Sequence, residues 1–483
     1  MKFVVKYFPE IIMKSRSVRK RFTKQLETNL RNISKKAQIR VDIQGHWDNL
    51  TVYSVDNEDR TRRKIIEILS HTPGIAFSLE IEEFQFETMD EAYKIVKEVN
   101  GPSLAGKTFC VRVKRKGTHD FTSHDIERYI GGGLLKETEA TGVKLKDPDI
   151  VVNVEIKDTR LYAVKNRIEG LGGYPLGSQG ELLSLISGGF DSTVASYLMM
   201  KRGLKTHYCF FNLGGSAHEI GVKQVAHYLW QKYGESHKVK FITVPFEGVI
   251  EEILKNVSDG HMGVVLKRMM YRAADQVTER FGLDTFVTGE SVAQVSSQTL
   301  TNLAVIDKAT DKLVLRPLVT MDKPEIIQLS REIGTEAFAA TMPEYCGVIS
   351  VKPTTEAKMD RVLEEEAKFD IEVLNQAVQN SKREDINKLM LSQENALEVP
   401  QVNIPSVGDI IIDIRHPHEV ENAPLVLTNN DVLTIPFYEL ESKKIDLDSD
   451  TTYLLYCQKG TMSQIHAHHL IEQGMTNIKV FAE

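Results

Sequence analysis

The chain has 483 residues, 41% of them hydrophobic and 26% charged, so it is long enough for three or four separate cores. No run approaches the roughly 20 apolar residues of a membrane-spanning helix, and residues 1–9 lack the layout of a signal peptide. We therefore expect a cytoplasmic protein without a membrane partner. Four widely spaced cysteines argue against a disulfide scaffold and a structural zinc site, so no metal site formed by the protein alone is expected.

The net charge of −7 is unevenly distributed along the chain. Residues 404–483 hold 12 acidic and 5 basic side chains, whereas residues 14–40 hold ten basic side chains and one acid, Glu27. A second basic cluster consists of Arg112, Lys114, Arg115 and Lys116. Basic regions on an acidic protein indicate contact with a polyanion, although a solvated helix face has the same composition.

The first 168 residues show two small α/β patterns in succession. Residues 1–75 have the βαββαβ order of a ferredoxin-like domain, and residues 76–168 form a second unit with a basic strand. The expected strands are 2–8, 38–43, 50–55, 75–84, 108–115, 149–156 and 160–166, and the expected helices are 17–35, 60–70, 88–99 and 123–139. Five glycines and a proline between Asn166 and Gly180 predict a domain boundary.

Residues 176–395 predict a third domain in which strands and helices alternate, which indicates a doubly wound parallel sheet. The expected strands are 182–186, 206–212, 239–245, 285–289 and 313–318, and the expected helices are 191–202, 216–233, 247–257, 261–281 and 324–333. The charged residues 354–400 predict a peripheral helical segment that ends in a linker. In such a sheet, ligands bind at the carboxyl ends of the strands.

The sequence Ser187-Gly188-Gly189-Phe190-Asp191-Ser192 joins the first of these strands to its helix. Glycines and hydroxyl residues at a helix N-terminus expose backbone N–H groups, which suits a phosphate or pyrophosphate. The Asp191 carboxylate would repel a bare anion, so it indicates a divalent cation shared with the phosphates. No Gly-Lys-Ser/Thr follows, so the loop is not of the Walker type. An ordinary glycine-rich turn is the alternative.

Weaker signals for nucleotide binding lie further along the same domain. Lys267 lies on a predicted helix, Gly289 ends a strand, and Gln298 belongs to a segment rich in hydroxyl and amide groups. Lys323 begins a helix, where a cation is unfavourable, so we interpret it as reaching for phosphate charge in a transition state.

Residues 404–483 predict a fourth, small α/β domain that carries a thiol at a strand end. Its expected strands are 409–414, 432–435, 452–457 and 477–481, with a helix at 462–473. Cys457 begins the sequence Cys457-Gln458-Lys459-Gly460-Thr461-Met462-Ser463, which resembles the C-x-x-G-x-x-S loop of rhodanese domains. Backbone N–H groups and a helix N-terminus at that position stabilise a thiolate or persulfide anion, whereas an inert buried cysteine is the alternative.

Cys346 lies in a loop after the predicted parallel sheet, so it provides a second thiol for exchange with Cys457. Cys110 and Cys209 lie in predicted strands, where we expect them to pack.

Taken together, these motifs resemble the bacterial tRNA uridine 4-sulfurtransferases, or 4-thiouridine synthetases, over essentially the whole chain. Other matching motifs are Cys110-Val111-Arg112-Val113-Lys114-Arg115, Arg128-Tyr129-Ile130-Gly131-Gly132-Gly133, His227-Tyr228-Leu229-Trp230, Val295-Ser296-Ser297-Gln298-Thr299-Leu300 and Met342-Pro343-Glu344-Tyr345-Cys346-Gly347. The resemblance implies an α/β multidomain fold. Its domains would be ferredoxin-like, THUMP (RNA binding), a PP-loop ATP pyrophosphatase of the adenine nucleotide alpha-hydrolase class, and rhodanese.

The resemblance also implies a reaction and its partners. ATP, with Mg²⁺, would adenylate the O4 atom of the uridine at position 8 of tRNA, and a cysteine desulfurase would load sulfur onto Cys457. The Cys457 persulfide would attack the activated carbon, and Cys346 would then form a disulfide with Cys457. A sulfur-carrier protein of thiamine thiazole synthesis is implied as a second sulfur acceptor.

The resemblance assigns roles to the candidate residues. Asp191 and Lys323 would handle the phosphates. The residues implied to contact ATP are Leu185, Ile186, Ser187, Gly188, Gly189, Ser192, Lys267, Gly289 and Gln298. The residues expected to bind RNA are Arg112, Lys114, Arg115 and Lys116.

Two other hypotheses stay open. An amide-forming synthetase would share the phosphate loop but needs an ammonia source, which the sequence does not show. A sulfur carrier without catalysis on RNA would need only the C-terminal domain. A thiolase that depends on an iron–sulfur cluster is disfavoured because the chain lacks the required group of cysteines.

Overall fold

The structure, a computed structural model, describes most of the chain, and it divides the chain into two compact units. Unit 1 comprises Met1–Gly180, Met200–Lys205 and Tyr233–His237, and unit 2 comprises Glu181–Met199, Thr206–Lys232 and Lys238–Glu483. None of the helices in the described residues has the length and apolar character needed to cross a bilayer. The described residues are 1–213, 216–340, 342, 352–389, 399–415, 417–436, 440, 447–448, 450–457, 463, 466–467, 470–471 and 474–482.

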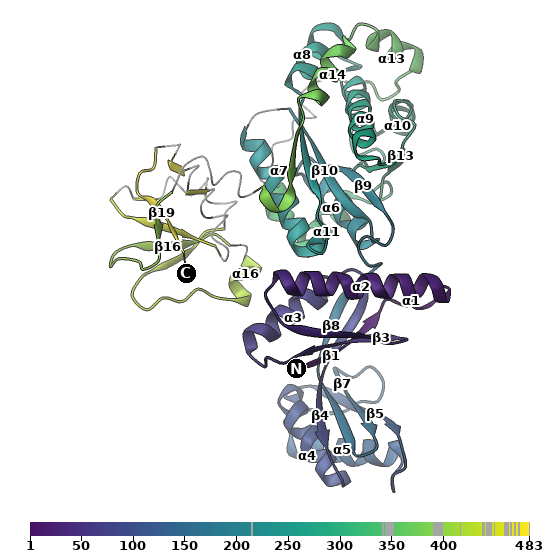
Figure 1. The fold of residues 1–483 in the computed structure, drawn as a ribbon, viewed down its shortest axis with the longest axis vertical. Coiled ribbons are helices and arrows are strands. Elements are labelled where there is room, and N and C mark those ends of the chain that lie inside the picture. The colour runs from purple at the N-terminus through teal and green to yellow at the C-terminus, as the bar shows by residue number, and fades with distance from the viewer. Residues whose placement is uncertain are drawn as a thin grey trace. The chain divides into compact units, whose positions relative to one another are not determined.

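Unit 1 is built on one continuous sheet to which both predicted N-terminal patterns contribute. Among the described residues, its strand order is β2-β3-β1-β4-β8-β7-β5-β6 (Figure 1). The strands are β1 (Lys2–Tyr7), β2 (Val41–Gly45), β3 (Asn49–Ser54), β4 (Ile75–Gln85), β5 (Thr108–Lys116), β6 (Gly142–Val143), β7 (Ile150–Lys157) and β8 (Arg160–Gly172). The helices are α1 (Pro9–Ile12), α2 (Arg16–Lys36), α3 (Asp59–His71), α4 (Met89–Asn100) and α5 (Ser123–Glu137).

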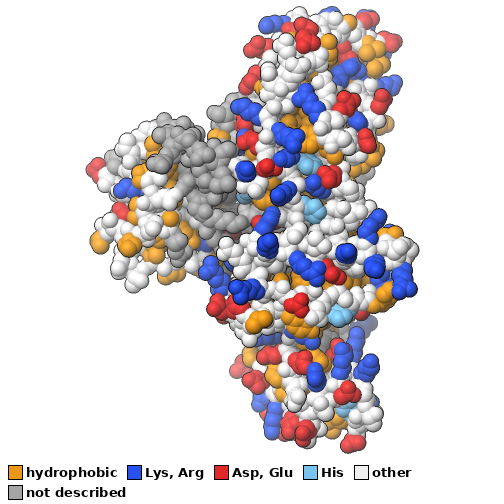
Figure 2. Space-filling view, viewed as in Figure 1, with side chains coloured by type: hydrophobic (Ala, Val, Ile, Leu, Met, Phe, Trp, Pro, Cys, Tyr) orange, Lys and Arg blue, Asp and Glu red, His pale blue; other side chains and the backbone are white. Residues whose placement is uncertain are grey.

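The predicted ferredoxin-like order is confirmed, since β1 pairs antiparallel with both β3 and β4. The strand expected to end at 166 is longer, because β8 pairs antiparallel with β4 along its length. Two separate cores lie along this sheet, one that includes Phe22 and Leu26 of α2 and one that includes Ile126 and Ile130 of α5. Figure 2 shows Lys and Arg side chains gathered over the outer surface of α2.

The main sheet of unit 2 has the order β13-β12-β9-β10-β11-β14 among the described residues. Strands β9 to β13 run parallel where their pairing is recorded, as predicted. The strands are β9 (Glu181–Leu185), β10 (Lys205–Asn212), β11 (Lys240–Pro245), β12 (Thr285–Val287), β13 (Leu313–Leu315) and β14 (Lys382–Asp385). The helices are α6 (Phe190–Lys201), α7 (Ser216–Leu229), α8 (Glu247–Asn256), α9 (Met262–Phe281), α10 (Leu300–Asp307), α11 (Lys323–Ile333), α12 (Glu336–Ala340), α13 (Met359–Glu366) and α14 (Ile371–Gln379).

Both faces of this sheet are covered by helices, because alternate residues of β10 belong to different cores. Cys209 and Phe211 pack in a core with α8 and α9, whereas Tyr208 and Phe210 pack in a core with Val222 of α7. A strand buried on both faces is read in sequence as a continuous apolar run, which is why β10 was predictable.

The prediction that residues 354–400 form a helical segment is wrong in part. Helices α13 and α14 are present, but Lys382–Asp385 form β14, which pairs antiparallel with β11 at the edge of the sheet. The four residues of β14 are all charged, so they carry no strand signal in the sequence. Pairing with β11 and an ion pair between Asp385 and Lys240 hold them in place.

The C-terminal sheet has the order β15-β19-β18-β16-β17, and each recorded pair is parallel. Its elements are β15 (Gln401–Val402), β16 (Ile410–Asp413), α16 (Pro417–Asn422), β17 (Val432–Thr434), β18 (Tyr453–Tyr456) and β19 (Ile478–Phe481). The linker predicted after the helical segment is wrong in part, because Gln401–Val402 form β15. Of the helix predicted at 462–473, the described residues are helical.

Candidate nucleotide and sulfur-transfer sites

The glycine loop lies at the carboxyl edge of the main parallel sheet, as predicted. Strand β9 ends at Leu185 and α6 begins at Phe190, so the backbone N–H groups between them lie at the N-terminus of a helix. Gly188 adopts a φ of +84°, and a Cβ atom there would lie 3.1 Å from side-chain atoms of Met342 and Val222. The positive φ favours glycine at position 188, and the tight side-chain contacts add to that preference.

The hydroxyl of Ser192 closes this loop from within. Its Oγ accepts a hydrogen bond from the Ser187 backbone N–H at 3.1 Å and donates to the Gly189 carbonyl at 3.3 Å. The Ser187 carbonyl in turn accepts from His218 Nε2 at 3.0 Å, and burial lowers the pKa of His218. Ser192 and His218 therefore shape the loop, while Ser187 is exposed to solvent.

Asp191 and Lys323 form an ion pair beside the loop. The Lys323 Nζ atom lies 2.8 Å from Oδ1 and 3.0 Å from Oδ2 of Asp191, and Gln294 Nε2 donates to Oδ2 at 2.8 Å. Lys323 is the first residue of α11, as predicted, and the N-cap Asp322 forms a capping box with Glu325 that offsets the unfavourable cation. Gln294 begins the segment rich in hydroxyl and amide groups that the sequence indicates for nucleotide binding, but no individual role was predicted for it.

Gly289 brings the end of β12 against the loop. A Cβ atom at Gly289 would lie 2.6 Å from the Asp191 carbonyl carbon and 2.7 Å from the Ser192 nitrogen. Both atoms are backbone and cannot move aside easily, so this close approach requires glycine.

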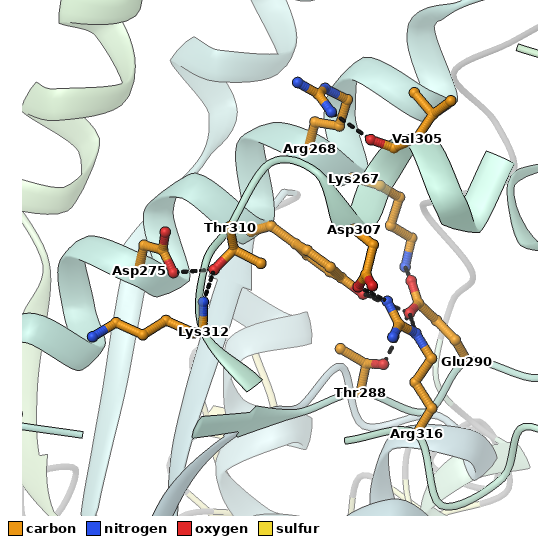
Figure 3. A network of polar contacts seen from close by, with 11 residues as sticks. Lys267, Arg268, Asp275, Thr288, Glu290, Val305, Asp307, Thr310, Lys312 and Arg316 are labelled. Atoms are coloured by element: carbon orange, nitrogen blue, oxygen red, sulfur yellow. Dashed lines mark hydrogen bonds and ion pairs between the residues drawn. The ribbon is translucent and has the colours of Figure 1, made fainter. Parts of the chain in front are cut away.

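A buried carboxylate, Glu290, follows directly; the sequence indicates a Gly-Glu turn there that could bind an adenosine, but it assigns no individual role to Glu290. Its side chain is 2% exposed, and its Oε2 atom accepts hydrogen bonds from Tyr271 at 2.6 Å, Thr288 at 2.9 Å and Arg316 at 3.0 Å. Figure 3 shows the side chain of Lys267 extended toward Oε1, with Nζ 3.9 Å away. The sequence signal for a role of Glu290 was its position just after a predicted strand, where ligands bind in parallel sheets.

The charge of Glu290 is set by opposing effects. Burial raises its pKa, but Lys267, Arg316 and the Tyr271 hydroxyl outweigh burial and hold the pKa below the usual value. Arg316 also contacts Asp307 at 2.7 Å and its pKa is raised, so the network stays ionised at neutral pH. The structure therefore holds Lys267 near a fixed negative charge.

The remaining predicted nucleotide residues lie around the same strand ends. Gln298 is buried, and its Oε1 accepts from the Ser291 backbone N–H at 3.2 Å, which shapes the loop after β12. Leu185 is half-buried and Ile186 is buried at the end of β9. The Lys323–Asp191 ion pair and the approach of Gly289 to the Asp191 backbone thus place these residues in one continuous region.

Cys457 follows β18 in the C-terminal sheet and is buried. Its Sγ atom accepts a hydrogen bond from the Ser463 backbone N–H at 3.3 Å and lies 3.5 Å from Ser463 Oγ. Next to β18, the Asp413 carboxylate holds Arg415 in a buried, two-point ion pair that raises the pKa of Arg415. Ser463 thus presents both its backbone N–H and its hydroxyl to the Cys457 sulfur.

The other cysteines divide into two groups. Cys346 lies outside the described residues. Cys110 and Cys209 are buried in strands, so the expectation that they pack is confirmed, and burial raises the pKa of the Cys209 thiol.

The basic cluster of β5 is split between the two faces of its strand. Arg112, Lys114 and Lys116 alternate outward and are exposed, whereas Arg115 lies on the face of the buried Val113. Arg115 contacts His119 Nδ1 at 2.9 Å and the ring of Phe121 at 5.9 Å. The structure therefore brings together three of the four predicted RNA-binding residues.

These features define the class of protein: a multidomain α/β enzyme with a PP-loop-type domain and a C-terminal domain of the rhodanese type. Four family models match the chain: the ThiI ferredoxin-like domain at residues 2–78, the THUMP domain at 86–163, the Thiamine biosynthesis protein (ThiI) at 177–371 and the Rhodanese-like domain at 397–483. The tRNA sulfurtransferases of Shewanella loihica and Shewanella piezotolerans are 53% and 54% identical to it over 482 residues. These alignments cover 100% of this chain and 99% and 100% of the relatives. The chain belongs to the ThiI family of tRNA sulfurtransferases.

Solved structures agree with this assignment. A crystal structure described as a 4-thiouridine synthetase–RNA complex with bound ATP is 26% identical, with a TM-score of 0.67, and the match covers 80% of this chain and 99% of that one. A Pyrococcus horikoshii Ot3 protein is 18% identical, with a TM-score of 0.51 and a match over 69% of this chain and 100% of that one, and shares the fold.

Proposed function

We propose that the chain transfers persulfide sulfur to a tRNA uridine and forms 4-thiouridine at the expense of ATP. One observation carries this proposal: a phosphate-type loop with its Asp191–Lys323 pair and a hydrogen-bonded thiol, Cys457, occur in one chain. Replacing a carbonyl oxygen by sulfur needs both an activated oxygen and a sulfur donor. The ATP and RNA bound to the similar 4-thiouridine synthetase support the same assignment.

The first step is adenylation of the uridine O4 atom, because a carbonyl oxygen is a poor leaving group whereas AMP is a good one. The loop N–H groups and Lys323 bind the phosphates that leave as pyrophosphate. The proposed ATP contacts are Leu185, Ile186, Ser187, Gly188, Gly189, Ser192, Lys267, Gly289 and Gln298.

Asp191 is the residue that would hold Mg²⁺. In the described residues, no three His, Cys, Asp or Glu side chains are grouped to hold a metal ion. One carboxylate is sufficient, since Mg²⁺ commonly binds one or two carboxylates together with substrate phosphates. When bound, Mg²⁺ would neutralise phosphate charge.

The second step is sulfur transfer, in which a cysteine desulfurase first supplies sulfane sulfur to Cys457. The terminal sulfur of the Cys457 persulfide attacks C4 of the adenylated uridine, and AMP leaves. The Cys346 thiolate then attacks the Cys457 sulfur, which forms a Cys346–Cys457 disulfide and releases the thiocarbonyl. An external dithiol reduces the disulfide before the next turnover.

The N-terminal domains are proposed to hold the tRNA, with the exposed Arg112, Lys114 and Lys116 as the main phosphate contacts and Arg115, on the other face of β5, as a weaker one. We place the domains at 1–75, 76–168, 176–395 and 404–483. A second function, sulfur supply to a carrier protein for thiamine thiazole synthesis, is favoured by the match to the thiamine biosynthesis family model.

Mass spectrometry of tRNA nucleosides tests the main proposal. The protein is incubated with tRNA, ATP, Mg²⁺, cysteine, a cysteine desulfurase and a dithiol, and each component is omitted in turn. We expect 4-thiouridine only in the complete reaction, with AMP and pyrophosphate in equal amounts. Formation of 4-thiouridine without ATP contradicts the adenylation step.

A further inference from the structure

An exposed tryptophan lies at the tip of the β2–β3 hairpin and has no part in the function proposed so far. Trp47 is 64% exposed, whereas the second tryptophan of the chain, Trp230, is 5% exposed. An indole ring open to water suits a ligand that can cover an aromatic face.

A buried arginine supports this ring from one side. The guanidinium of Arg19, from α2, lies 3.9 Å from the centre of the Trp47 ring, and Arg19 is 6% exposed. Its Nη2 donates to the Trp47 carbonyl, and its Nη1 donates to the Ile12 carbonyl at 3.4 Å. Arg19 thus contacts both the ring and the backbone of Trp47, and 64% of the residue stays open to solvent.

Backbone and side-chain contacts from its neighbours support the turn that carries Trp47. The His46 N–H donates to the Asn49 carbonyl at 2.8 Å, and the Tyr7 hydroxyl donates to the His46 carbonyl at 3.4 Å. Asp48 forms an ion pair with Lys6 at 3.0 Å, and this contact lowers the pKa of Asp48. A fixed ring loses little conformational entropy when a ligand stacks on it.

The surroundings of the hairpin are strongly basic. Arg16, Lys20, Arg21 and Lys24 of α2 are exposed, and Figure 2 shows basic side chains across this helix. A positively charged surface beside an aromatic face is the combination that binds single-stranded nucleic acid, in which bases stack on aromatic rings.

We propose that Trp47 is a stacking platform for an unpaired nucleobase of the RNA, with the ring held between that base and Arg19. This inference rests on the proposed function, because it assigns an additional RNA contact to the same enzyme.

Tryptophan fluorescence of the full chain provides the direct test, since Trp47 and Trp230 are the only two tryptophans. Titration with tRNA should quench the emission of the unaltered protein and of Trp230→Phe, and leave that of Trp47→Phe unchanged. A fully paired RNA duplex of similar length should bind without quenching. Quenching that persists in Trp47→Phe, or its absence from the unaltered protein at saturating tRNA, would overturn the stack.

Affinity and its salt dependence give an independent measurement. Trp47→Ala should weaken tRNA binding between about 5-fold and about 150-fold, the range for loss of one base stack. The slope of log affinity against log salt should not change, because the indole is neutral. Val55→Ser, which alters a 94% exposed valine directly after β3, is the matched control and should bind as the unaltered protein does.

The remaining outcomes separate the two proposals. If Trp47→Ala binds tRNA normally but loses binding of the desulfurase, the ring contacts protein and the stacking proposal is wrong while the proposed function stands. If the unaltered protein fails to bind tRNA at all, both proposals are wrong.

Discussion

At the scale of single residues, the charge on Glu290 is the feature that sequence reasoning missed and the structure makes prominent. Four side chains converge on this carboxylate, two from α9 and one each from the segments that follow β12 and β13. Strand order in the folded sheet creates this convergence, so no local pattern indicates it. The glycine loop, by contrast, was predictable because its six residues are contiguous.

Glu290→Gln should destabilise unit 2 by about 3 kcal/mol at neutral pH, because Arg316 and Lys267 lose their buried counter-charge. The pKa of Glu290 is lowered on folding, so its stabilisation is present above the unfolded-state pKa and is lost as pH falls through the folded-state pKa. The difference in unfolding free energy between Glu290→Gln and the unaltered protein should therefore disappear at low pH.

Urea unfolding at several pH values measures this effect through Trp230, which lies in unit 2, in the Trp47→Phe background. Asp284→Asn is the matched control, since Asp284 pairs with Lys312 while its own side chain is 92% exposed. That control should change stability by less than about 0.5 kcal/mol. If this difference in unfolding free energy stays constant at every pH tested, the charge of Glu290 does not have the assigned role.

Gly289→Ala should reduce ATP affinity by at least about 10-fold, because the new Cβ atom displaces the backbone of Asp191 and Ser192 that forms the loop. Isothermal titration with ATP measures the loss. Gly263→Ala in α9 is the control, since no atom lies within 4 Å of its added Cβ, and it should leave affinity unchanged. Equal ATP affinity in both variants would show that the loop tolerates the shift.

At the scale of elements, the side chains of β5 alternate between the two faces of the strand. Basic residues that are neighbours in the sequence therefore lie on opposite faces. The sequence shows a run of basic residues, and the period of two in a strand assigns Arg115 to the inner face, where it contacts His119 and Phe121. Strands with apolar runs, such as β10, were predicted well. The charged strand β14 was not, because only its pairing with β11 makes it a strand.

The Arg112→Glu, Lys114→Glu double variant should flatten the dependence of tRNA affinity on salt by about 1.5 in log–log slope, since each lost phosphate contact removes about 0.7 to 0.9. Arg115→Glu should change this slope less, because its side chain lies on the opposite face. Filter binding across a salt series compares the variants. An unchanged slope in the double variant rules out this surface as a phosphate contact.

At the scale of the whole molecule, the thiol of Cys457 and the loop around Asp191 belong to different sheets of the chain. The two proposed products, 4-thiouridine and the sulfur-loaded carrier protein, therefore depend on different parts of the chain. Asp191→Ala should abolish 4-thiouridine and leave sulfur transfer to the thiazole carrier protein intact, whereas Cys457→Ser should abolish both. Nucleoside mass spectrometry and thiocarboxylate detection on the carrier measure the two products. Loss of both products in Asp191→Ala refutes the separation.

The long pairing of β4 with β8 determines how this protein can be divided. A truncation that starts at residue 76 would remove β1, one of the two neighbours of β4, and expose a bare edge prone to aggregation. Hybrids made with relatives must therefore exchange the whole of residues 1–172 as a single module. The hairpin that carries Trp47 and the basic strand β5 then stay in one sheet, with β1, β4, β8 and β7 between them.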